Sequence, residues 1–303
     1  MTNSNKSVWR ILARMRGNVR RAMMLFAGRK DRTRHNVDPL PPGQRPQDIL
    51  AVLLLTVGIA VVVFDIPTYP WLRSLPNEYR RAFSTFTDFG KADWILVSTG
   101  VVCLFLLALD ASRYAFRLRM TIGAVFTYCA FIFYSVAATG LLAIAFKWTL
   151  GRARPKLYEE VGPVRFDFFA FDGTYTSFPS GHSTTVAALA TALAFIFPSY
   201  RWLIIVAGFW TAFSRVMVGA HYPSDVVAGT LLGITFTFFT IRALAHRRIG
   251  FHISSSGKIR PNMNSRSARA CVRTVWQVLC GQRGTKRVLP EGSAGDKTER
   301  TGA

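Results

Sequence analysis

Acidic residues are scarce in this sequence. It holds 16 Asp and Glu against 38 Lys and Arg, for a formal net charge of +22 at pH 7. Across the 118 residues from Gly173 to Pro290, Asp225 is the only carboxylate. Magnesium sites and two-metal sites need several oxygen ligands close together. We therefore predict that the protein uses no metal ion and no other cofactor.

Cysteine is also rare, with four residues in 303. Cys103 and Cys129 lie inside apolar runs, whereas Cys271 and Cys280 lie in the basic C-terminal segment, too far apart for a CxxC metal pair. This pattern excludes a disulfide framework and a cysteine metal site. We expect all four cysteines to be structurally incidental.

Apolar residues, in contrast, make up 50% of the chain and gather in long uncharged runs. Such runs exclude a soluble basic protein that binds nucleic acid. A bilayer core of about 30 Å needs roughly 20 helical residues, and interfacial Trp or Tyr neighbours extend the shorter runs to that length. No run shows the polar stripe of a water-facing helix. We predict an all-α membrane protein with six transmembrane helices, over residues 49–64, 94–109, 120–146, 183–200, 202–214 and 226–241.

The basic residues are concentrated at the two ends of the chain. Residues 1–48 carry a net charge of +8 and residues 242–303 carry +10, whereas the segment 65–93 balances four basic with four acidic residues. By the positive-inside rule both termini are cytoplasmic, where the partner of this charge is an anionic lipid surface. The segments 65–93, 147–182 and 220–225 then form outward loops. In a bacterium this places the protein in the inner membrane with those loops in the periplasm.

We divide the chain into a basic tail (1–48), a six-helix domain (49–245) and a second basic tail (246–303) that we expect to be disordered. No cleavable signal peptide is evident, because the first apolar run begins only at Ile49. Within residues 8–26, apolar residues share one helical face, which predicts an interfacial helix on anionic lipid. Alternatives are a disordered basic tail and an Arg-rich organelle transit peptide.

Ionisable residues at a membrane edge are costly and therefore candidate functional residues. The first cluster is KWTLGRARP at 147–155. Lys147 and Arg154 are seven residues, or two helical turns, apart, so we expect both to project from one face of a helix that Pro155 ends. Two such cations suggest an anion-binding cradle. The alternative is that they snorkel to lipid headgroups.

The second cluster is FPSGHS at 178–183, just before the fourth predicted helix. Pro179, Ser180 and Gly181 permit a tight turn, after which free amides at the helix start can point at a phosphate. His182 stands beside these amides. The alternative is an ordinary helix cap followed by an exposed histidine.

The third cluster is SRVMVGAHYPSD at 214–225. Arg215 interrupts an apolar run, and His221 precedes Asp225 by four residues at a helix start opened by Pro223. A carboxylate near an imidazole can fix the tautomer that leaves the other ring nitrogen free to attack. The alternative is an interfacial salt bridge from Asp225 to Arg215.

Taken together, the patterns K-x6-RP, PSGH and SR-x5-H-x3-D resemble the three-part signature of the type 2 phosphatidic acid phosphatase superfamily, in order and spacing. The resemblance covers residues 49–245. It implies a six-helix membrane phosphatase without a metal, in which His221 becomes a phosphohistidine, Asp225 orients His221, and His182 protonates the leaving group and then activates water. It further implies that the phosphoryl oxygens are held by Lys147, Arg154, Ser180, the Gly181 amide and Arg215.

The substrate expected from this resemblance is a lipid phosphate whose headgroup sits at the interface. Residues 151–171 resemble bacterial enzymes that remove phosphate from lipid A, which we rank first. Undecaprenyl diphosphate and phosphatidylglycerol phosphate are the alternatives. The signature also occurs in soluble vanadate-dependent haloperoxidases, against which the apolar runs argue. An anion channel or transporter would have no need of the His221 and Asp225 pair. The sequence does not indicate an oligomeric state.

Overall fold

The computed structural model describes residues 3–29, 42–263 and 273, and helices dominate this part of the chain. Cys271, Cys280 and most of the predicted second tail lie outside the described residues. The main helices are α1 (Asn3–Gly28), α2 (Pro46–Ile59), α3 (Ile66–Ser74), α4 (Asn77–Asp88), α5 (Ala92–Ala108), α6 (Phe116–Leu150), α7 (Tyr158–Val161), α8 (Gly181–Ile196), α9 (Arg201–Met217) and α10 (Pro223–His246). A π-helical turn, η1 (Ala60–Asp65), joins α2 to α3, and 3-10 turns are η2 (Ala111–Arg113), η3 (Pro155–Leu157), η4 (Gly173–Tyr175) and η5 (Pro198–Tyr200).

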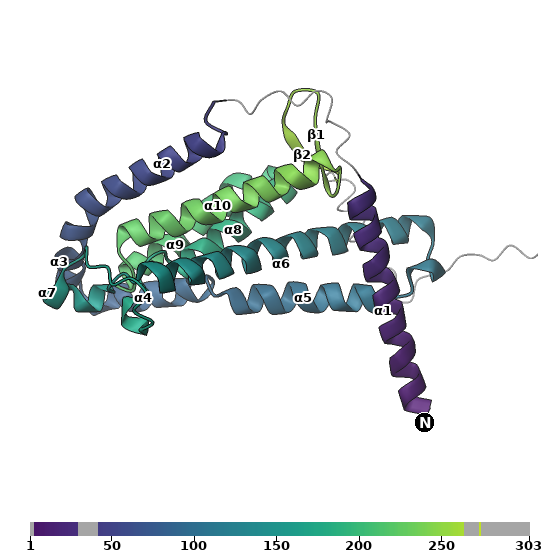
Figure 1. Ribbon diagram of the computed structural model, residues 1–303, viewed down its shortest axis with the longest axis horizontal. Coiled ribbons are helices and arrows are strands. Elements are labelled where there is room, and N and C mark those ends of the chain that lie inside the picture. Colours follow the sequence, from purple (N-terminus) through teal and green to yellow (C-terminus); the bar gives the residue numbers. More distant parts are fainter. Residues whose placement is uncertain (1–2, 30–41, 264–272, 274–303) are drawn as a thin grey trace, which may run out of the picture.

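Helices α5, α6, α8, α9 and α10 form an elongated bundle, from which α2 splays away (Figure 1). Four helical segments of the described chain are long and apolar enough to cross a membrane, over 46–74, 77–108, 116–150 and 223–246. Helices α8 and α9 are shorter, with 16 and 17 residues. A mostly helical membrane protein is therefore confirmed, while the number of six spans and their orientation remain predictions.

The segment 65–93, which is predicted to face outward, contains two helices. This segment is helical in α3 and α4, and η1 carries the chain from α2 into α3 without a break. Asp65, the last residue of η1 and the first of this predicted outward segment, is fully buried. The two apolar runs that flank this segment therefore belong to longer helical segments than the hydropathy pattern indicates.

Two glycines let α8 and α10 pack closely beside the predicted site. A Cβ atom at Gly229 would lie 2.5 Å from the Ser180 carbonyl oxygen, and one at Gly233 would lie 2.5 Å from the Thr184 carbonyl oxygen. Both distances are shorter than a van der Waals contact, so only glycine permits this approach. The start of α8 is thereby held against the first turns of α10.

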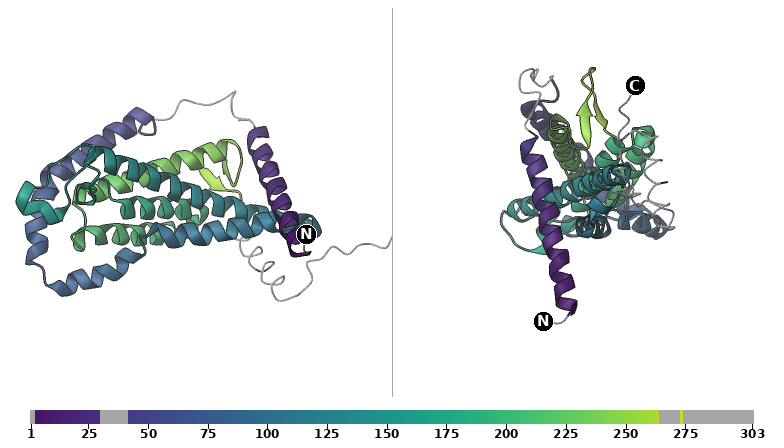
Figure 2. Two further views of the ribbon diagram at one scale, coloured as in Figure 1. Left: turned by 60° about the horizontal axis from the view of Figure 1, so that its bottom comes forward. Right: turned by 90° about the vertical axis from the view of Figure 1, so that its right-hand side faces the viewer.

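Helix α1 runs across one end of the bundle, in a direction that differs from its long axis (Figures 1 and 2). Its Asn18 side-chain amide donates hydrogen bonds to the carbonyl oxygens of Leu107 and Leu109, at 2.7 and 3.2 Å, and Arg14 donates to that of Ala108 at 3.3 Å. These carbonyls belong to the end of α5, where a helix leaves acceptors without partners. Helix α1 is therefore attached to the bundle by polar contacts.

The predicted disorder of the C-terminal tail is wrong for its first residues. Strands β1 (Phe251–Ile253) and β2 (Ile259–Pro261) form an antiparallel hairpin at the same end of the bundle as α1. Phe251 is fully buried and packs edge-on against Tyr128 and Phe131 of α6. Ile253, Ile259 and Met263 pack against the same apolar cluster, so burial of these side chains with the Phe251 ring explains why the hairpin is folded in a segment of polar composition.

Candidate active site

The end of the bundle opposite α1 contains all three predicted clusters. The first cluster departs from its predicted shape, because α6 ends at Leu150 and not at Pro155. Gly151 adopts a left-handed conformation, with φ of 59°, and a Cβ there would lie 1.7 Å from the Asp167 carbonyl oxygen. Lys147 therefore extends from the last helical turn, whereas Arg154 lies in the extended segment that follows, and they do not share one helical face.

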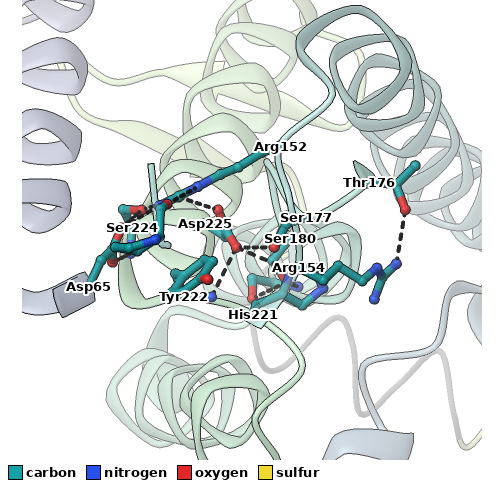
Figure 3. Close-up of polar contacts among 12 residues, drawn as sticks. Asp65, Arg152, Arg154, Thr176, Ser177, Ser180, His221, Tyr222, Ser224 and Asp225 are labelled. Atoms are coloured by element: carbon teal, nitrogen blue, oxygen red, sulfur yellow. Dashed lines mark hydrogen bonds and ion pairs between the residues drawn. The ribbon is translucent and has the colours of Figure 1, made fainter. Parts of the chain in front are cut away.

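Backbone hydrogen bonds hold this extended segment between two parts of the loop. The Ala153 amide donates to the Arg165 carbonyl and the Arg154 amide donates to the Thr174 carbonyl, both at 3.0 Å. The Arg154 side chain donates from Nε to the Gly173 carbonyl at 3.1 Å and from Nη2 to the Thr176 hydroxyl at 3.1 Å (Figure 3). Its Nη1 has no partner among the described residues and is free to bind an anion.

The second cluster forms the start of α8, as predicted. Ser180 is the N-cap, and its hydroxyl oxygen accepts hydrogen bonds from the Ser183 amide at 3.4 Å and the Ser183 hydroxyl at 2.9 Å. The amides of Gly181 and His182 donate to no group of the described chain, so they can receive an anion. The Lys147 ammonium lies 3.8 Å from where a Cβ of Gly181 would stand. The helix start and this cation therefore face the same space.

The third cluster contributes Arg215 from the end of α9. Its Nη1 donates to the hydroxyl of Thr87 at 2.8 Å, whereas its Nε, although buried, has no hydrogen-bond partner in the described chain. The alternative salt bridge between Arg215 and Asp225 is wrong, because Asp225 pairs with Arg152 instead. His182 is within electrostatic reach of Arg215, His221 and Lys147. The three clusters thus converge.

His221 lies in the turn before α10 and is 3% exposed. Its Nδ1 is 3.5 Å from Oδ2 of Asp225, longer than a hydrogen bond, as catalytic pairs often are in ligand-free enzymes. Burial lowers the pKa of His221 to about 4, with the Asp225 carboxylate opposing the shift and the Lys147 and Arg215 cations adding to it. The imidazole is therefore neutral near pH 7 and can act as a nucleophile.

Three further groups hold Asp225, and sequence reasoning identified none of them as its partner. Its Oδ2 accepts hydrogen bonds from the Ser177 hydroxyl at 2.6 Å and the Tyr222 amide at 2.9 Å, and its Oδ1 accepts from Nη1 of Arg152 at 2.6 Å (Figure 3). Ser177 carries no sequence signal of its own. Arg152 could have been noticed as a charged residue at a membrane edge.

Arg152 also binds a second carboxylate, that of Asp65, which the sequence predicts to be in an outward loop. Its Nη2 is 2.7 Å from Oδ2 of Asp65, and both side chains are fully buried. Burial alone would lower the pKa of Arg152, but the carboxylates of Asp225 and Asp65 outweigh it and raise the pKa. The signal for Asp65 was that it ends the uncharged run 49–64.

The described residues contain no group of three or more His, Cys, Asp or Glu side chains placed to hold a metal ion. What the site offers is a set of cations and amide hydrogens for a tetrahedral anion, beside a buried neutral histidine. Such groups stabilise the charge that builds up on a phosphoryl group in transfer. Together with the membrane-length helices, they define a membrane enzyme that acts on phosphate esters.

Comparison with known proteins narrows this class to one family. Residues 128–249 match the PAP2 superfamily. A lipid A 1-phosphatase from Rhizobium johnstonii is 34% identical over 218 residues, which cover 71% of this chain and 88% of that protein. An undecaprenyl-diphosphatase from Sulfolobus acidocaldarius is 39% identical over 67 residues, or 22% of this chain and 32% of that protein. The chain belongs to the PAP2 superfamily, and it is a membrane lipid phosphatase.

Among solved structures, a transmembrane PAP2 type phosphatidylglycerolphosphate phosphatase from Bacillus subtilis is similar, with a TM-score of 0.44 and 19% sequence identity. The similarity covers 63% of this chain and 92% of that chain.

Proposed function

We propose that this protein removes a phosphate from lipid A, at the 1-position, through a metal-independent phosphohistidine mechanism. The observation that carries the substrate is the Rhizobium lipid A 1-phosphatase, whose similarity covers most of both chains. The undecaprenyl-diphosphatase similarity is confined to 22% of this chain, so undecaprenyl diphosphate is the second candidate.

In the first step Nε2 of His221 attacks phosphorus, a P–N bond forms, and the P–O bond to the lipid breaks. His182 gives its proton to the leaving lipid oxygen. In the second step His182 takes a proton from water, the resulting oxygen attacks phosphorus, and the P–N bond breaks to release phosphate and restore His221. The covalent intermediate divides one difficult displacement into two easier ones.

The cations around His221 supply the electrostatic part of catalysis. In this proposal Lys147, Nη1 of Arg154 and Arg215 hold the phosphoryl oxygens together with the amides of Gly181 and His182. It is supported by the Lys147 ammonium beside Gly181 and by the donors of the two arginines that have no partner in the described chain. The hydroxyl hydrogen of Ser180 is free to join them, because its oxygen acts only as an acceptor for Ser183. Fixed donors of this kind favour the transition state because they need no reorganisation as charge develops.

Exposed aromatic side chains support a lipid substrate. Phe168, Phe169 and Phe171 lie in the loop that follows α7 and are each more than 60% exposed. Trp148, in the last turn of α6, stacks on Phe171 with 5.8 Å between ring centroids. Aromatic rings gather where a membrane protein meets the interface, so this end of the bundle suits a headgroup whose acyl chains remain in the bilayer.

The opposite end suits the cytoplasmic face of the inner membrane, with the active site then in the periplasm. Helix α1 lies across that end and exposes Trp9, Leu12, Met23 and Phe26 together with several arginines. A helix with apolar and basic faces that lies across the end of the spans fits an orientation in the plane of an anionic leaflet.

The substrate assignment is tested with purified protein in detergent and a panel of lipid A, undecaprenyl diphosphate, phosphatidylglycerol phosphate and phosphatidic acid. We expect the highest kcat/KM with lipid A and loss of the 1-phosphate in the product. If undecaprenyl diphosphate gives the highest kcat/KM instead, the substrate assignment changes to this second candidate and the proposed mechanism is unaffected.

The mechanism is tested with His221→Ala and with EDTA. We expect the variant to lose more than about 10³-fold in kcat, the scale of removing a nucleophile, while it still binds vanadate. Wild-type turnover should persist in EDTA. Turnover that stops with EDTA and returns with magnesium would contradict the proposal, and so would a His221→Ala variant of normal activity.

A further inference from the structure

Arg152 is saturated with hydrogen bonds and cannot bind substrate. A guanidinium has five N–H donors. Here Nε and Nη2 donate to the Pro163 carbonyl at 3.1 and 2.6 Å, Nη2 also donates to Asp65, and Nη1 donates to Asp225 and to the Ser224 hydroxyl at 2.6 Å. All five donors are used within the protein. Arg152 therefore differs in kind from Arg154, two residues along the chain, whose Nη1 remains free.

The groups around Arg152 form one closed network. Ser224, the residue before Asp225, donates its amide to Oδ1 of Asp65 at 3.0 Å and its hydroxyl to Oδ2 of Asp65 at 2.5 Å. The rings of Tyr222 and Phe166 lie 4.6 and 5.5 Å from the guanidinium carbon. The first membrane segment, which carries Asp65, is thus connected to the start of α10 by buried polar contacts (Figure 3).

The network has one cation for two carboxylates. Asp65, Asp225 and Arg152 are all fully buried, so water does not screen their charges. A buried cluster of this kind is strongly destabilised when one partner is removed, yet its presence is weak evidence for a role in stability. With both carboxylates ionised, its net charge is −1, and the nearest group that gains positive charge during the proposed reaction is His221, 3.5 Å from Asp225.

We propose that Asp65 and Arg152 are positioning residues for the catalytic pair, an inference that rests on the proposed phosphohistidine mechanism. Arg152 holds Oδ1 of Asp225, so that Oδ2 is directed at Nδ1 of His221. Asp65 holds Arg152 and supplies the second negative charge. When Nε2 of His221 attacks phosphorus the imidazole becomes positive, and the cluster together with His221 becomes neutral.

This inference predicts a defect in phosphoryl transfer and not in binding. In Asp65→Asn the side chain keeps its size and an oxygen for Arg152, but loses its charge. We expect the rate of phosphoenzyme formation, measured by rapid quench with ³²P-labelled lipid, to fall about 10- to 100-fold, the range found for outer partners that orient reacting groups. The KM and the inhibition constant of vanadate should change less than about threefold, because the phosphate cradle is untouched.

The matched control is Glu159→Gln. Glu159 also pairs with an arginine, Arg73, at the same end of the molecule, but at 3.3 Å and with both side chains about 60% exposed. An exposed pair contributes little to stability, so this variant should match the wild-type protein in every measurement. Comparison of the two variants distinguishes the effect of losing a buried charge from the effect of losing any carboxylate near the site.

A folded Asp65→Asn protein with a wild-type rate of phosphoenzyme formation would overturn the inference. So would a drop in rate matched by an equal loss of vanadate affinity, since that indicates general damage to the site. If Asp65→Asn fails to fold, Ser224→Ala gives the answer, because it removes one hydrogen bond from Arg152 and one from Asp65 and keeps all charges. A reduced rate in a stable Ser224→Ala protein supports the inference, and an unchanged rate rejects it.

The His221→Ala experiment distinguishes this inference from the proposed function. A dead His221→Ala variant beside a fully active Asp65→Asn variant would leave the mechanism intact and remove only the positioning role. An active His221→Ala variant would remove both.

Discussion

The backbone amide of Ser180 donates a hydrogen bond of 3.0 Å to the carbonyl oxygen of Asp225. This bond joins the N-cap of α8 to the first turn of α10, and therefore joins the second sequence cluster to the third. It exists because Gly229 lets the two helices approach, with the Ser180 carbonyl oxygen in the space that a Cβ would occupy. The spacing between phosphate-binding amides and the nucleophile is thus set by backbone contact.

Gly229→Ala should separate these helices. The added methyl group would meet the Ser180 carbonyl oxygen at 2.5 Å, and overpacking of this kind costs about 1–3 kcal/mol. We expect a lower melting temperature in detergent. We also expect a lower kcat at temperatures at which the variant is still folded. The control is Gly123→Ala in α6, where no atom lies within 4 Å of the new Cβ. Equal activity in the two variants would contradict the role assigned to this contact.

The pH dependence should reflect the buried state of His221. Its pKa is lowered to about 4, so the imidazole is neutral above that pH and protonated below it. Because the protonated ring has no free lone pair on Nε2, protonation of His221 should lower kcat/KM only when the pH falls through about 4. Burial also lowers the pKa of the proposed general acid His182 to about 4, so loss of its proton should lower kcat/KM as the pH rises above that value. A pH–rate profile of the free enzyme measures both limbs. An acid limb centred near 6.5 would indicate a solvated histidine instead.

Gly151→Ala should disrupt the site through the backbone. The position has φ of 59°, and the new Cβ would collide with the Asp167 carbonyl oxygen at 1.7 Å. Since Arg152 follows directly, we expect loss of both stability and turnover. Gly257→Ala is the control, because its φ of 74° imposes a similar strain but no atom lies within 4 Å. It should lower the melting temperature by a smaller amount and leave kcat unchanged.

The orientation of α1 can be tested in proteoliposomes. We expect Trp9 emission, isolated by comparison with Trp9→Phe, to be quenched by brominated lipid in vesicles that contain phosphatidylglycerol. Replacing the exposed Arg10, Arg16 and Arg20 by Gln should reduce this quenching, since each basic residue near an anionic surface contributes about 1 kcal/mol. Arg14 is left in place because it caps α5. Quenching that is insensitive to both charge and salt would contradict an electrostatic attachment.

Most of the candidate site could be predicted from spacing, because its chemistry is carried by residues that stand out in an apolar chain. Lys147, His182, Arg215 and His221 were all found in this way. The prediction for Arg154 failed in its geometry, since the helix ends at Leu150 and not at Pro155. A left-handed turn depends on what packs against it, here the Asp167 carbonyl, and that contact is not visible in a hydropathy pattern.

The partners of Asp225 could not be predicted from its neighbours in the sequence, for a different reason. Asp65 is 160 positions away in the chain, and Arg152 occupies a position that the K-x6-RP pattern leaves unspecified. A carboxylate at the end of an apolar run can face solvent or the interior, and only the packing of η1 against α10 decides which. The hairpin at 251–261 was missed similarly, since its fold depends on the packing of Phe251, Ile253 and Ile259 against a cluster that contains residues of α6.

The amino-acid sequence alone determined that this protein is helical, is embedded in a membrane, carries its positive charge at both ends and acts on a phosphate group. Those properties follow from short-range periodicity, from the cost of charge in lipid and from the types of side chain present. Tertiary structure decided which cations stay free for substrate and which arginine is consumed by buried carboxylates. That distinction depends on contacts between segments that are far apart in the chain. The residues next to each arginine in the sequence do not indicate those contacts.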